Sequence, residues 1–204
     1  MNTTHSQERI ILTDCDGCLC NWEYAFSVWM QERGHVAKPS RKHSYQLCDH
    51  YVDLTPEQAM DLVHQFNESA AIGFLPALRD SVHYVKRLHE ELGYVFHCIT
   101  SLSSDQNAQK LREMNLQKLF GSTVFDKIVF LPTAADKDAA LEPYRNSGYF
   151  WIEDLPKNAE TGLRMGLRSV LVEHGHNMHH VNKHIPIVKN WKEIFELVSG
   201  QISL

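Results

Sequence analysis

The stretch Arg9-Ile10-Ile11-Leu12-Thr13-Asp14-Cys15-Asp16-Gly17 decides the fold of this chain. Its apolar part, Ile10 to Leu12, is rich in β-branched residues and predicts a buried strand. The strand ends in Asp14 and Asp16, and ligands of open α/β sheets bind at the carboxyl ends of strands. Two acids this close repel each other unless a cation lies between them or one holds a proton. An ordinary Asp-Gly turn is the simpler alternative, because both residues are common in turns.

The length and composition suit one folded domain with a small insert. The chain has 204 residues, and its hydrophobic fraction of 43% is enough to form a core. The net charge of −5 at pH 7 argues against a basic surface for nucleic acid, so no long nucleic acid is expected as a partner. A single nucleotide stays open, because a metal and a few local cations can hold one phosphate.

The sequence shows no pattern typical of a signal peptide or of a membrane span. Residues 1–8 are polar and carry no apolar signal-peptide core, and no apolar run approaches the length of a membrane span. Five cysteines, an odd number, suggest reduced thiols and a cytoplasmic protein. Cys15, Cys18 and Cys20 lack a second cysteine pair at zinc spacing, so we interpret them as packing residues rather than a zinc site.

A helical insert is predicted after the first strand. Trp22, Phe26 and Trp29 recur at helical spacing, and Thr55-Pro56 is typical of the start of a second helix, running to about Ala70. We therefore predict two parts, a helical cap over residues 21–73 and an α/β core over residues 1–20 and 74–204.

The core sequence alternates between strand and helix patterns. Further strands are expected at 94–100, 128–131, 149–154, 168–172 and 185–188, and helices at 79–92, 103–115, 136–144, 158–165 and 191–198. Alternation of this kind implies a parallel sheet with right-handed crossovers. The predicted fold class is α/β, with a Rossmann-like parallel sheet and helices on both of its faces.

Polar residues follow the predicted strands at the edge where ligands bind. They are Asp14 and Asp16 after the first strand, Thr100 and Ser101 after the second, Asp136-Lys137 before the fourth, and Glu153 and Asp154 after the fourth. Carboxylate oxygens favour Mg²⁺, which leaves room for phosphate oxygens and water. Hydroxyls, a helix N-terminus and a lysine can hold an anion. The sequence thus predicts a small, charged, oxygen-rich site.

Four motifs in this order, Asp14-Cys15-Asp16-Gly17, Thr100-Ser101, Lys137 and Glu153-Asp154, resemble those of the haloacid dehalogenase-like superfamily. The insert resembles that superfamily's C1 cap. More closely, the chain resembles the 5'(3')-deoxyribonucleotidases. The matching stretches are 14–23, 96–101, 152–156, 176–179 and 190–194. The chain departs from that family at Glu153, where an Asp is usual, and at Leu155, where some members carry Arg.

The resemblance implies a role for each matching residue. Asp14 would attack phosphorus and form an aspartyl-phosphate, and Asp16 would serve as the general acid and then the general base. Mg²⁺ would be bound by Asp14, the backbone carbonyl of Asp16 and Asp154, with Glu153 behind them or bridged by water. Thr100, Ser101 and Lys137 would hold the phosphate. The cap would close over the site and exclude water.

Trp22 and the histidines allow two interpretations each. A tryptophan at the start of such a helix is more often a core residue of the cap than a substrate-binding platform for a base, and the family resemblance adds weight to the platform for Trp22. The group His174, His176, His179 and His180 is either a metal site or a solvated loop and helix start, and we favour the loop.

The leading hypothesis is a Mg²⁺-dependent phosphomonoesterase for a small nucleotide, a deoxyribonucleoside 5'- or 3'-monophosphate. One alternative is a phosphatase for another small phosphate ester or for a nucleic-acid 3' end. Another is a catalytically silent binding protein, which the intact set of Asp14, Asp16, Lys137 and Asp154 disfavours. Dehalogenases that resemble this fold lack the second acid, so Asp16 disfavours that activity. The oligomeric state, a homodimer included, stays open.

Overall fold

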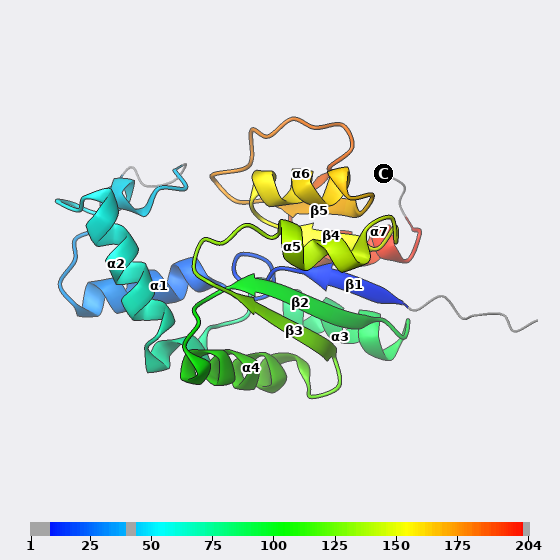
Figure 1. The fold of residues 1–204 in the computed structure, drawn as a ribbon, viewed down its shortest axis with the longest axis horizontal. Helices are drawn as coiled ribbons and strands as arrows, with labels where there is room; N and C mark the ends of the chain where they lie inside the picture. The colour runs from blue at the N-terminus through cyan, green and yellow to red at the C-terminus, as the bar shows by residue number, and fades with distance from the viewer. Residues whose placement is uncertain (1–8, 40–43, 202–204) are drawn as a thin grey trace, which may run out of the picture.

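The computed structural model describes residues 9–39 and 44–201. Within these ranges, six parallel strands form one sheet in the order β3-β2-β1-β4-β5-β6 (Figure 1). The strands are β1 (Ile10–Thr13), β2 (Val95–Ser101), β3 (Phe125–Leu131), β4 (Phe150–Glu153), β5 (Arg168–Val172) and β6 (Ile187–Val188). The predicted α/β fold class is confirmed. The prediction for residues 1–8 lies outside the described residues.

Helices cover both faces of the sheet because alternate residues of each strand point to opposite sides. Ile11 shares an apolar core with residues of α3 (Ser81–Glu90), α4 (Gln106–Phe120) and α7 (Trp191–Val198). Its neighbours Ile10 and Leu12 pack on the other face, where α5 (Asp138–Leu141), η3 (Glu142–Tyr144) and α6 (Pro156–Arg164) lie (Figure 1). The strand order changes direction between β1 and β4, which is where ligands bind in such sheets.

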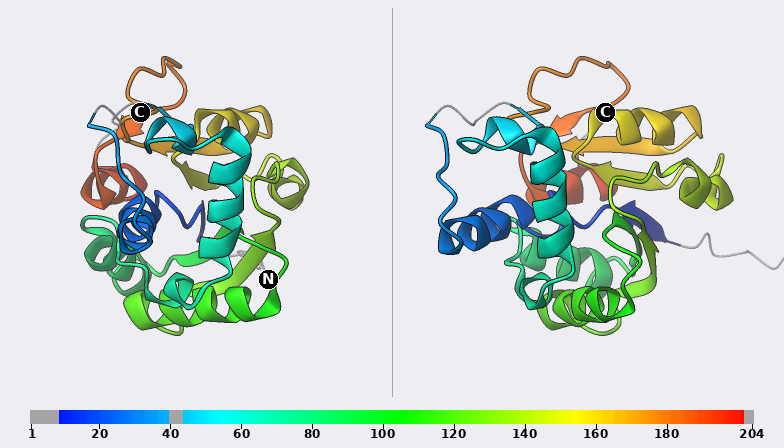
Figure 2. Two further views of the ribbon diagram at one scale, coloured as in Figure 1. Left: turned by 90° about the vertical axis from the view of Figure 1, so that its left-hand side faces the viewer. Right: turned by 60° about the vertical axis from the view of Figure 1, so that its left-hand side comes forward.

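The described residues of the range 21–73 (21–39 and 44–73), here called the helical segment, lie beyond the carboxyl ends of the strands (Figures 1 and 2). Asn21 begins the first helix by accepting a hydrogen bond from the Tyr24 amide, and Thr55 begins the second through a reciprocal capping box with Gln58. The elements are α1 (Trp22–Glu32), η1 (Leu47–Asp49), α2 (Pro56–Asn67) and η2 (Ala70–Phe74). The division of the chain into a core and a cap stays a prediction.

Two helices of the core differ from the sequence prediction. The helix expected to end near Asn115 continues to Phe120, and Gly121, at φ +111°, ends it. Asn115 is buried and donates from its amide to the Leu75 carbonyl, so its role is tertiary contact rather than helix termination. The helix expected over 136–144 is α-helical only at Asp138–Leu141, because Pro143 lacks an amide hydrogen and a 3₁₀ turn follows.

None of the helices in the described ranges is long and apolar enough to cross a membrane.

Candidate functional site

The loop after β1 is held tightly at the edge of the sheet. The amide of Asp14 continues the pairing with β4 by donating to the Ile152 carbonyl at 2.9 Å. The Cys15 carbonyl accepts from the Cys20 amide at 2.9 Å, which folds the loop back on itself. Cys15, Cys18 and Cys20 are all fully buried in the core. The loop therefore presents its acids from a rigid, packed base.

Gly17 allows the β1 loop and the end of β4 to meet. Its φ is +73°, and a Cβ atom built on it would lie 2.5 Å from Oδ2 of Asp154. A larger residue would both strain the backbone and displace that carboxylate. The glycine of the opening stretch thus sets how closely Asp154 approaches Asp14 and Asp16.

Lys137 lies between two acids from different elements. Its Nζ atom is 2.7 Å from Oδ2 of Asp14 and 2.7 Å from Oε1 of Glu153. The lysine side chain is almost completely buried. Burial alone would lower the pKa of Lys137, but the two carboxylates outweigh burial and raise its pKa above the ordinary value. The site therefore contains a fixed ammonium charge.

Both carboxylate oxygens of Glu153 accept hydrogen bonds from groups of the protein. Oε1 accepts from Lys137 and from Nδ2 of Asn158, while Oε2 accepts from the backbone amides of Asp154 and Leu155. Its side chain has no exposed area. Glu153 therefore anchors Lys137 and the start of α6, which leaves Asp154 as the acid of this pair that faces the pocket.

Among the described residues, three acids are close enough together to hold a metal ion. Single carboxylate oxygens of Asp14, Glu153 and Asp154 lie within 4.8 Å of one another. Burial, together with the charge of Glu153 and against the pull of Lys137, raises the pKa of Asp14 to about 6. Burial and the two neighbouring acids raise the pKa of Asp154 well above its ordinary value. Oxygen donors that repel one another in this way fit a hard divalent cation such as Mg²⁺.

Asp16 has a cation of its own, Arg112 on α4, which the sequence analysis missed. The guanidinium atoms NH1 and NH2 lie 2.7 and 3.2 Å from the two carboxylate oxygens of Asp16. The Arg112 side chain is completely buried, whereas that of Asp16 is 23% exposed. A signal was available, since Arg112 falls on the core-facing stripe of α4 between Ala108 and Leu116.

The loop after β5 also reaches the site. His174 donates from Nε2 to the Gly17 carbonyl at 2.7 Å, and His176 contacts the Asp154 carbonyl at 3.1 Å. Asn177 donates to the same Asp154 carbonyl at 2.6 Å. The predicted loop is confirmed, because residues 173–180 form turns and coil, but the predicted helix start is wrong. The rings of His174 and His176 are half-buried and support the backbone of the acid-bearing loops. Burial lowers the pKa of both imidazoles, which favours their neutral forms.

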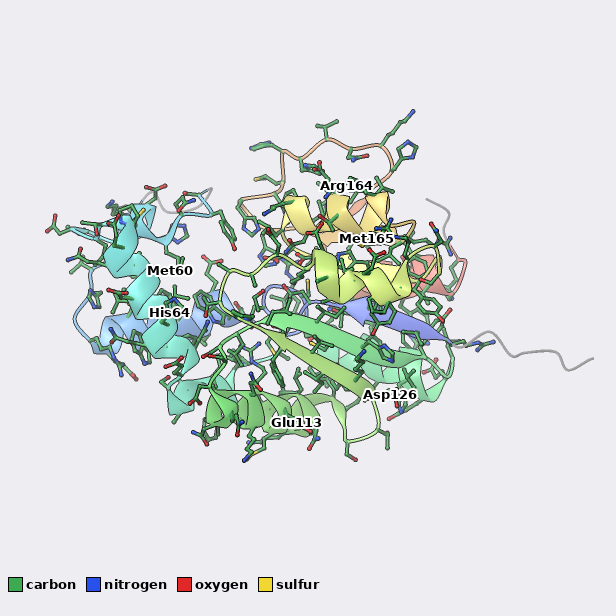
Figure 3. All side chains as sticks on the ribbon, viewed as in Figure 1. Met60, His64, Glu113, Asp126, Arg164 and Met165 are labelled. Atoms are coloured by element: carbon green, nitrogen blue, oxygen red, sulfur yellow. The ribbon has the colours of Figure 1, made fainter. Side chains whose placement is uncertain are left out.

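These groups open onto a pocket of about 400 Å³ between the sheet edge and the helical segment. The sheet side contributes Asp14, Asp16, Ser101, Lys137, Asp154, Lys157, His174 and His176, among others, and the helical segment contributes Trp22, Tyr45, Met60, Val63 and Asn67, among others. Figure 3 labels Met60 on α2. Thr100 does not line the pocket. It is buried, and its hydroxyl has no hydrogen-bond partner among the described residues.

Trp22 packs within the helical segment and also lines the pocket. Its ring stacks on Phe26, with centroids 4.7 Å apart, and meets the edge of Phe66. Its Nε1 atom donates to Oδ1 of Asn67 at 2.9 Å, which ties the start of α1 to the end of α2. It is nevertheless half-buried rather than buried, and it lines the pocket. Trp22 is thus a packed residue with an accessible part.

Comparison with known sequences gives a limited match. No protein-family model matches the chain. A protein of Enterobacteria phage T4, described as an uncharacterized 32.4 kDa protein in the Gp30-rIII intergenic region, is 25% identical over 114 residues. The aligned part is 54% of this chain and 40% of the phage protein, so it spans less than half of that relative's length.

Comparison with solved structures matches nearly the whole chain. A haloacid dehalogenase-like family hydrolase from Streptococcus pneumoniae has a TM-score of 0.63 at 16% identity, covering 92% of this chain and 97% of its own. A predicted phosphatase from Clostridium acetobutylicum has a TM-score of 0.62 at 15% identity, covering 94% and 98%. The D,D-heptose 1,7-bisphosphate phosphatase of B. bronchiseptica, complexed with magnesium and phosphate, has a TM-score of 0.58 at 13% identity, covering 95% and 99%. The chain therefore has the α/β fold of the haloacid dehalogenase-like hydrolases.

Proposed function

We propose that this protein is a Mg²⁺-dependent phosphomonoesterase that hydrolyses a small nucleotide through an aspartyl-phosphate intermediate. The substrate class is a deoxyribonucleoside 5'- or 3'-monophosphate, as in the 5'(3')-deoxyribonucleotidases that the motifs resemble. The observation that carries the proposal is the arrangement of Asp14, Lys137 and Asp154 on the floor of one pocket, with Asp16 beside them. The five free cysteines support a place in the reducing cytoplasm.

Asp14 is the proposed nucleophile. Its Oδ1 accepts from the Cys15 amide at 2.6 Å and its Oδ2 contacts Lys137, so the carboxylate is already oriented before substrate arrives. In the first step a carboxylate oxygen forms a bond to phosphorus while the bond from phosphorus to the leaving oxygen breaks. The Lys137 ammonium offsets the negative charge that collects on the phosphoryl oxygens.

Asp16 is the proposed acid and base. Its proton passes to the leaving oxygen in the first step, which releases the nucleoside as a neutral alcohol. In the second step Asp16 takes a proton from water as that water attacks phosphorus. The bond between Asp14 and phosphorus then breaks, inorganic phosphate leaves, and Asp16 is again protonated.

The residues that would hold Mg²⁺ are Asp14, Asp154 and the backbone carbonyl of Asp16. When bound, the ion would supply positive charge next to the substrate phosphate and hold it beside Asp14. Glu153 holds Lys137 and the turn into α6 rather than the ion, because each of its oxygens already accepts two hydrogen bonds. Thr100 and Ser101 stay the proposed phosphate-binding residues of the β2 end. Ser101 lines the pocket, whereas Thr100 is buried behind it with a hydroxyl that has no hydrogen-bond partner among the described residues.

The walls of the pocket support a nucleotide as substrate. Trp22 presents aromatic surface and Met60 and Val63 of α2 present apolar surface on the wall that the helical segment provides. Tyr45 lies nearer the acids, with its ring 5.4 Å from that of His176. A phosphate bound near Lys137 would place the attached nucleoside against that wall. We propose that the helical segment acts as a cap and that Trp22 contacts the base.

A phosphate-release screen tests the proposal. Purified protein is incubated with 5'- and 3'-mononucleotides, sugar phosphates and p-nitrophenyl phosphate, with Mg²⁺ or with EDTA. We expect turnover of mononucleotides that EDTA abolishes and Mg²⁺ restores. Preference for a sugar phosphate or for a 3'-phosphorylated oligonucleotide would support the alternative substrate classes. Absence of release from every substrate, with Mg²⁺ present, would support a silent binding protein.

A further inference from the structure

Arg112 is an unusual residue for the position that it occupies. It lies in the middle of α4, has no exposed side-chain area, and shares the core-facing stripe with Ala108 and Leu116. Arginine is almost never fully buried without a charged partner, because removing the guanidinium from water is expensive. Arg112 therefore needs Asp16, and the contact between them links α4 to the loop after β1.

The contact is a fork rather than a single bond. NH1 and NH2 each meet a different oxygen of Asp16, at 2.7 and 3.2 Å. Two parallel bonds fix the plane and the rotation of a carboxylate, which a single ammonium cannot do. Because Arg112 is entirely buried and Asp16 lines the pocket, the free side of the carboxylate faces the pocket.

The helix that carries Arg112 is itself held in place. Three residues further along α4, Asn115 donates to the carbonyl of Leu75, which directly follows η2. A Cβ atom on Gly73 would lie 3.2 Å from the Leu111 side chain, so η2 and α4 pack closely there. The guanidinium thus approaches Asp16 from a helix that is locked on two sides.

We propose that Arg112 is the positioning residue for Asp16. Its fork holds the carboxyl group at the angle from which the group delivers a proton to the leaving oxygen and later removes one from water. Lys137 serves Asp14 separately, so two acids two positions apart are each oriented by a different buried cation. This inference rests on the proposed function, because it assigns a geometry to the acid and base of that reaction.

The test uses Arg112→Lys, which keeps the charge and loses the fork, and Arg112→Gln, which removes the charge as well. Each variant is made in the wild-type and in the Asp16→Asn background. The exposed Lys110→Gln on the same helix is the matched control. The first chemical step is followed by rapid quench with Mg²⁺ present, on the best nucleotide of the screen and on p-nitrophenyl phosphate.

We expect Arg112→Lys to slow the first step for the nucleotide by about 10-fold or more, part of the ~10²–10⁴-fold that general acid catalysis contributes. The step with p-nitrophenyl phosphate should change little, because p-nitrophenolate leaves without a proton. KM should stay near the wild-type value. In the Asp16→Asn background Arg112→Lys should have no further effect, because its partner acid is already gone.

Other outcomes would overturn the inference. If Arg112→Lys slows the first step equally for both substrates and still does so in the Asp16→Asn background, Arg112 is a merely structural residue. If Arg112→Lys leaves the rate with the nucleotide unchanged, Arg112 does not position Asp16. If Arg112→Lys does not fold by circular dichroism, Arg112→Gln gives the same comparison without a buried unpaired cation. A wild-type protein that hydrolyses neither substrate would instead contradict the proposed function, which this design separates from the role of Arg112.

Discussion

Asp14 and Asp16 stand two positions apart, yet their environments differ in ways that assign them different tasks. Asp14 is nearly buried and pairs with Lys137, whereas the side chain of Asp16 keeps 23% of its area exposed and pairs with Arg112. Burial, against the opposing pull of Arg112, raises the pKa of Asp16 to about 7. Burial also raises the pKa of Asp14, to about 6, so near neutral pH Asp14 is mainly the carboxylate that a nucleophile needs, while Asp16 can give up and take back a proton.

Substitutions should separate these two acids. Asp14→Asn removes the proposed nucleophile, so we expect no phosphoenzyme and no turnover on any substrate. Asp16→Asn should slow the first step with a nucleotide by ~10²–10⁴-fold, and with p-nitrophenyl phosphate by much less. Rapid-quench kinetics on both substrates measures the difference. Turnover by Asp14→Asn, or equal slowing of both substrates by Asp16→Asn, would contradict the assigned roles.

Substitutions of the second pair of acids, Glu153 and Asp154, should have different effects, one on stability and the other on the Mg²⁺ requirement. Asp154→Asn should raise the Mg²⁺ concentration needed for half-maximal activity far more than Glu153→Gln does. Glu153→Gln weakens charge-assisted hydrogen bonds in the core, so it should lower the free energy of unfolding by about 1.5–3 kcal/mol. Mg²⁺ titration and urea unfolding measure the two effects. The opposite order would mean that Glu153 binds the ion.

Residue types at strand ends could be predicted from the sequence, but their partners could not. The positions of Asp14, Lys137 and Asp154 followed from the strand pattern, because carboxyl ends of parallel strands share one edge. Arg112 is 96 residues from Asp16 and lies inside a helix, so no local pattern joins them. The contact of His174 with the Gly17 carbonyl cannot be predicted from a local pattern either, because the two residues are 157 positions apart.

At the scale of elements, α1 and α2 form one aromatic unit above the sheet edge. Trp22, Phe26, Trp29 and Phe66 contact one another across the two helices. Asn67 joins this unit to the sheet side by donating to the Leu102 carbonyl at 3.2 Å. The wall that the helical segment gives the pocket is therefore part of a packed cluster.

Two tryptophans of this cluster offer a matched comparison. Trp22→Ala should raise KM for a nucleotide by the equivalent of about 1–3 kcal/mol, the range for stacking of a base on an aromatic ring, and barely affect p-nitrophenyl phosphate. Trp29→Ala removes an indole that does not line the pocket, so it should lower stability and treat both substrates alike. Steady-state kinetics and thermal unfolding of both variants distinguish a residue that contacts the base from one that only packs. Equal KM changes on both substrates for Trp22→Ala would make it a packing residue only.

Element boundaries were predictable where the chain carries its own stop signal. The strand at Arg168–Val172 and the helix at Trp191–Val198 match the predicted ranges, with Asn190 accepting a hydrogen bond from the Glu193 amide at the start of that helix. The end of α4 was mispredicted, because Asn115 is a helix-ending residue by propensity but is retained in the helix by a tertiary hydrogen bond.

For the whole molecule, the site is a concentration of buried like charge that a cation would relieve. A ligand that binds only the folded state raises the free energy of unfolding, by about 2.7 kcal/mol at 100 times its dissociation constant. We expect Mg²⁺ to raise the Tm of the wild type and EDTA to reverse the shift, without any substrate present. Asp154→Asn should abolish most of the shift and Lys110→Gln should leave it intact. If Mg²⁺ does not change the Tm of the wild type, the assignment of Asp154 as a Mg²⁺ ligand is wrong.

The strand order also decides when this site can exist during synthesis. β1 pairs with β4, so Asp14 emerges from the ribosome about 140 residues ahead of Glu153 and Asp154. Until β4 docks, Asp14, the proposed nucleophile, lacks Glu153 and Asp154 as neighbours, and the ends of the long intervening chain must first come together. A nascent or prematurely terminated chain therefore carries the motif without the assembled chemistry. We infer that phosphate-ester cleavage begins only when the second half of the sheet has joined the first.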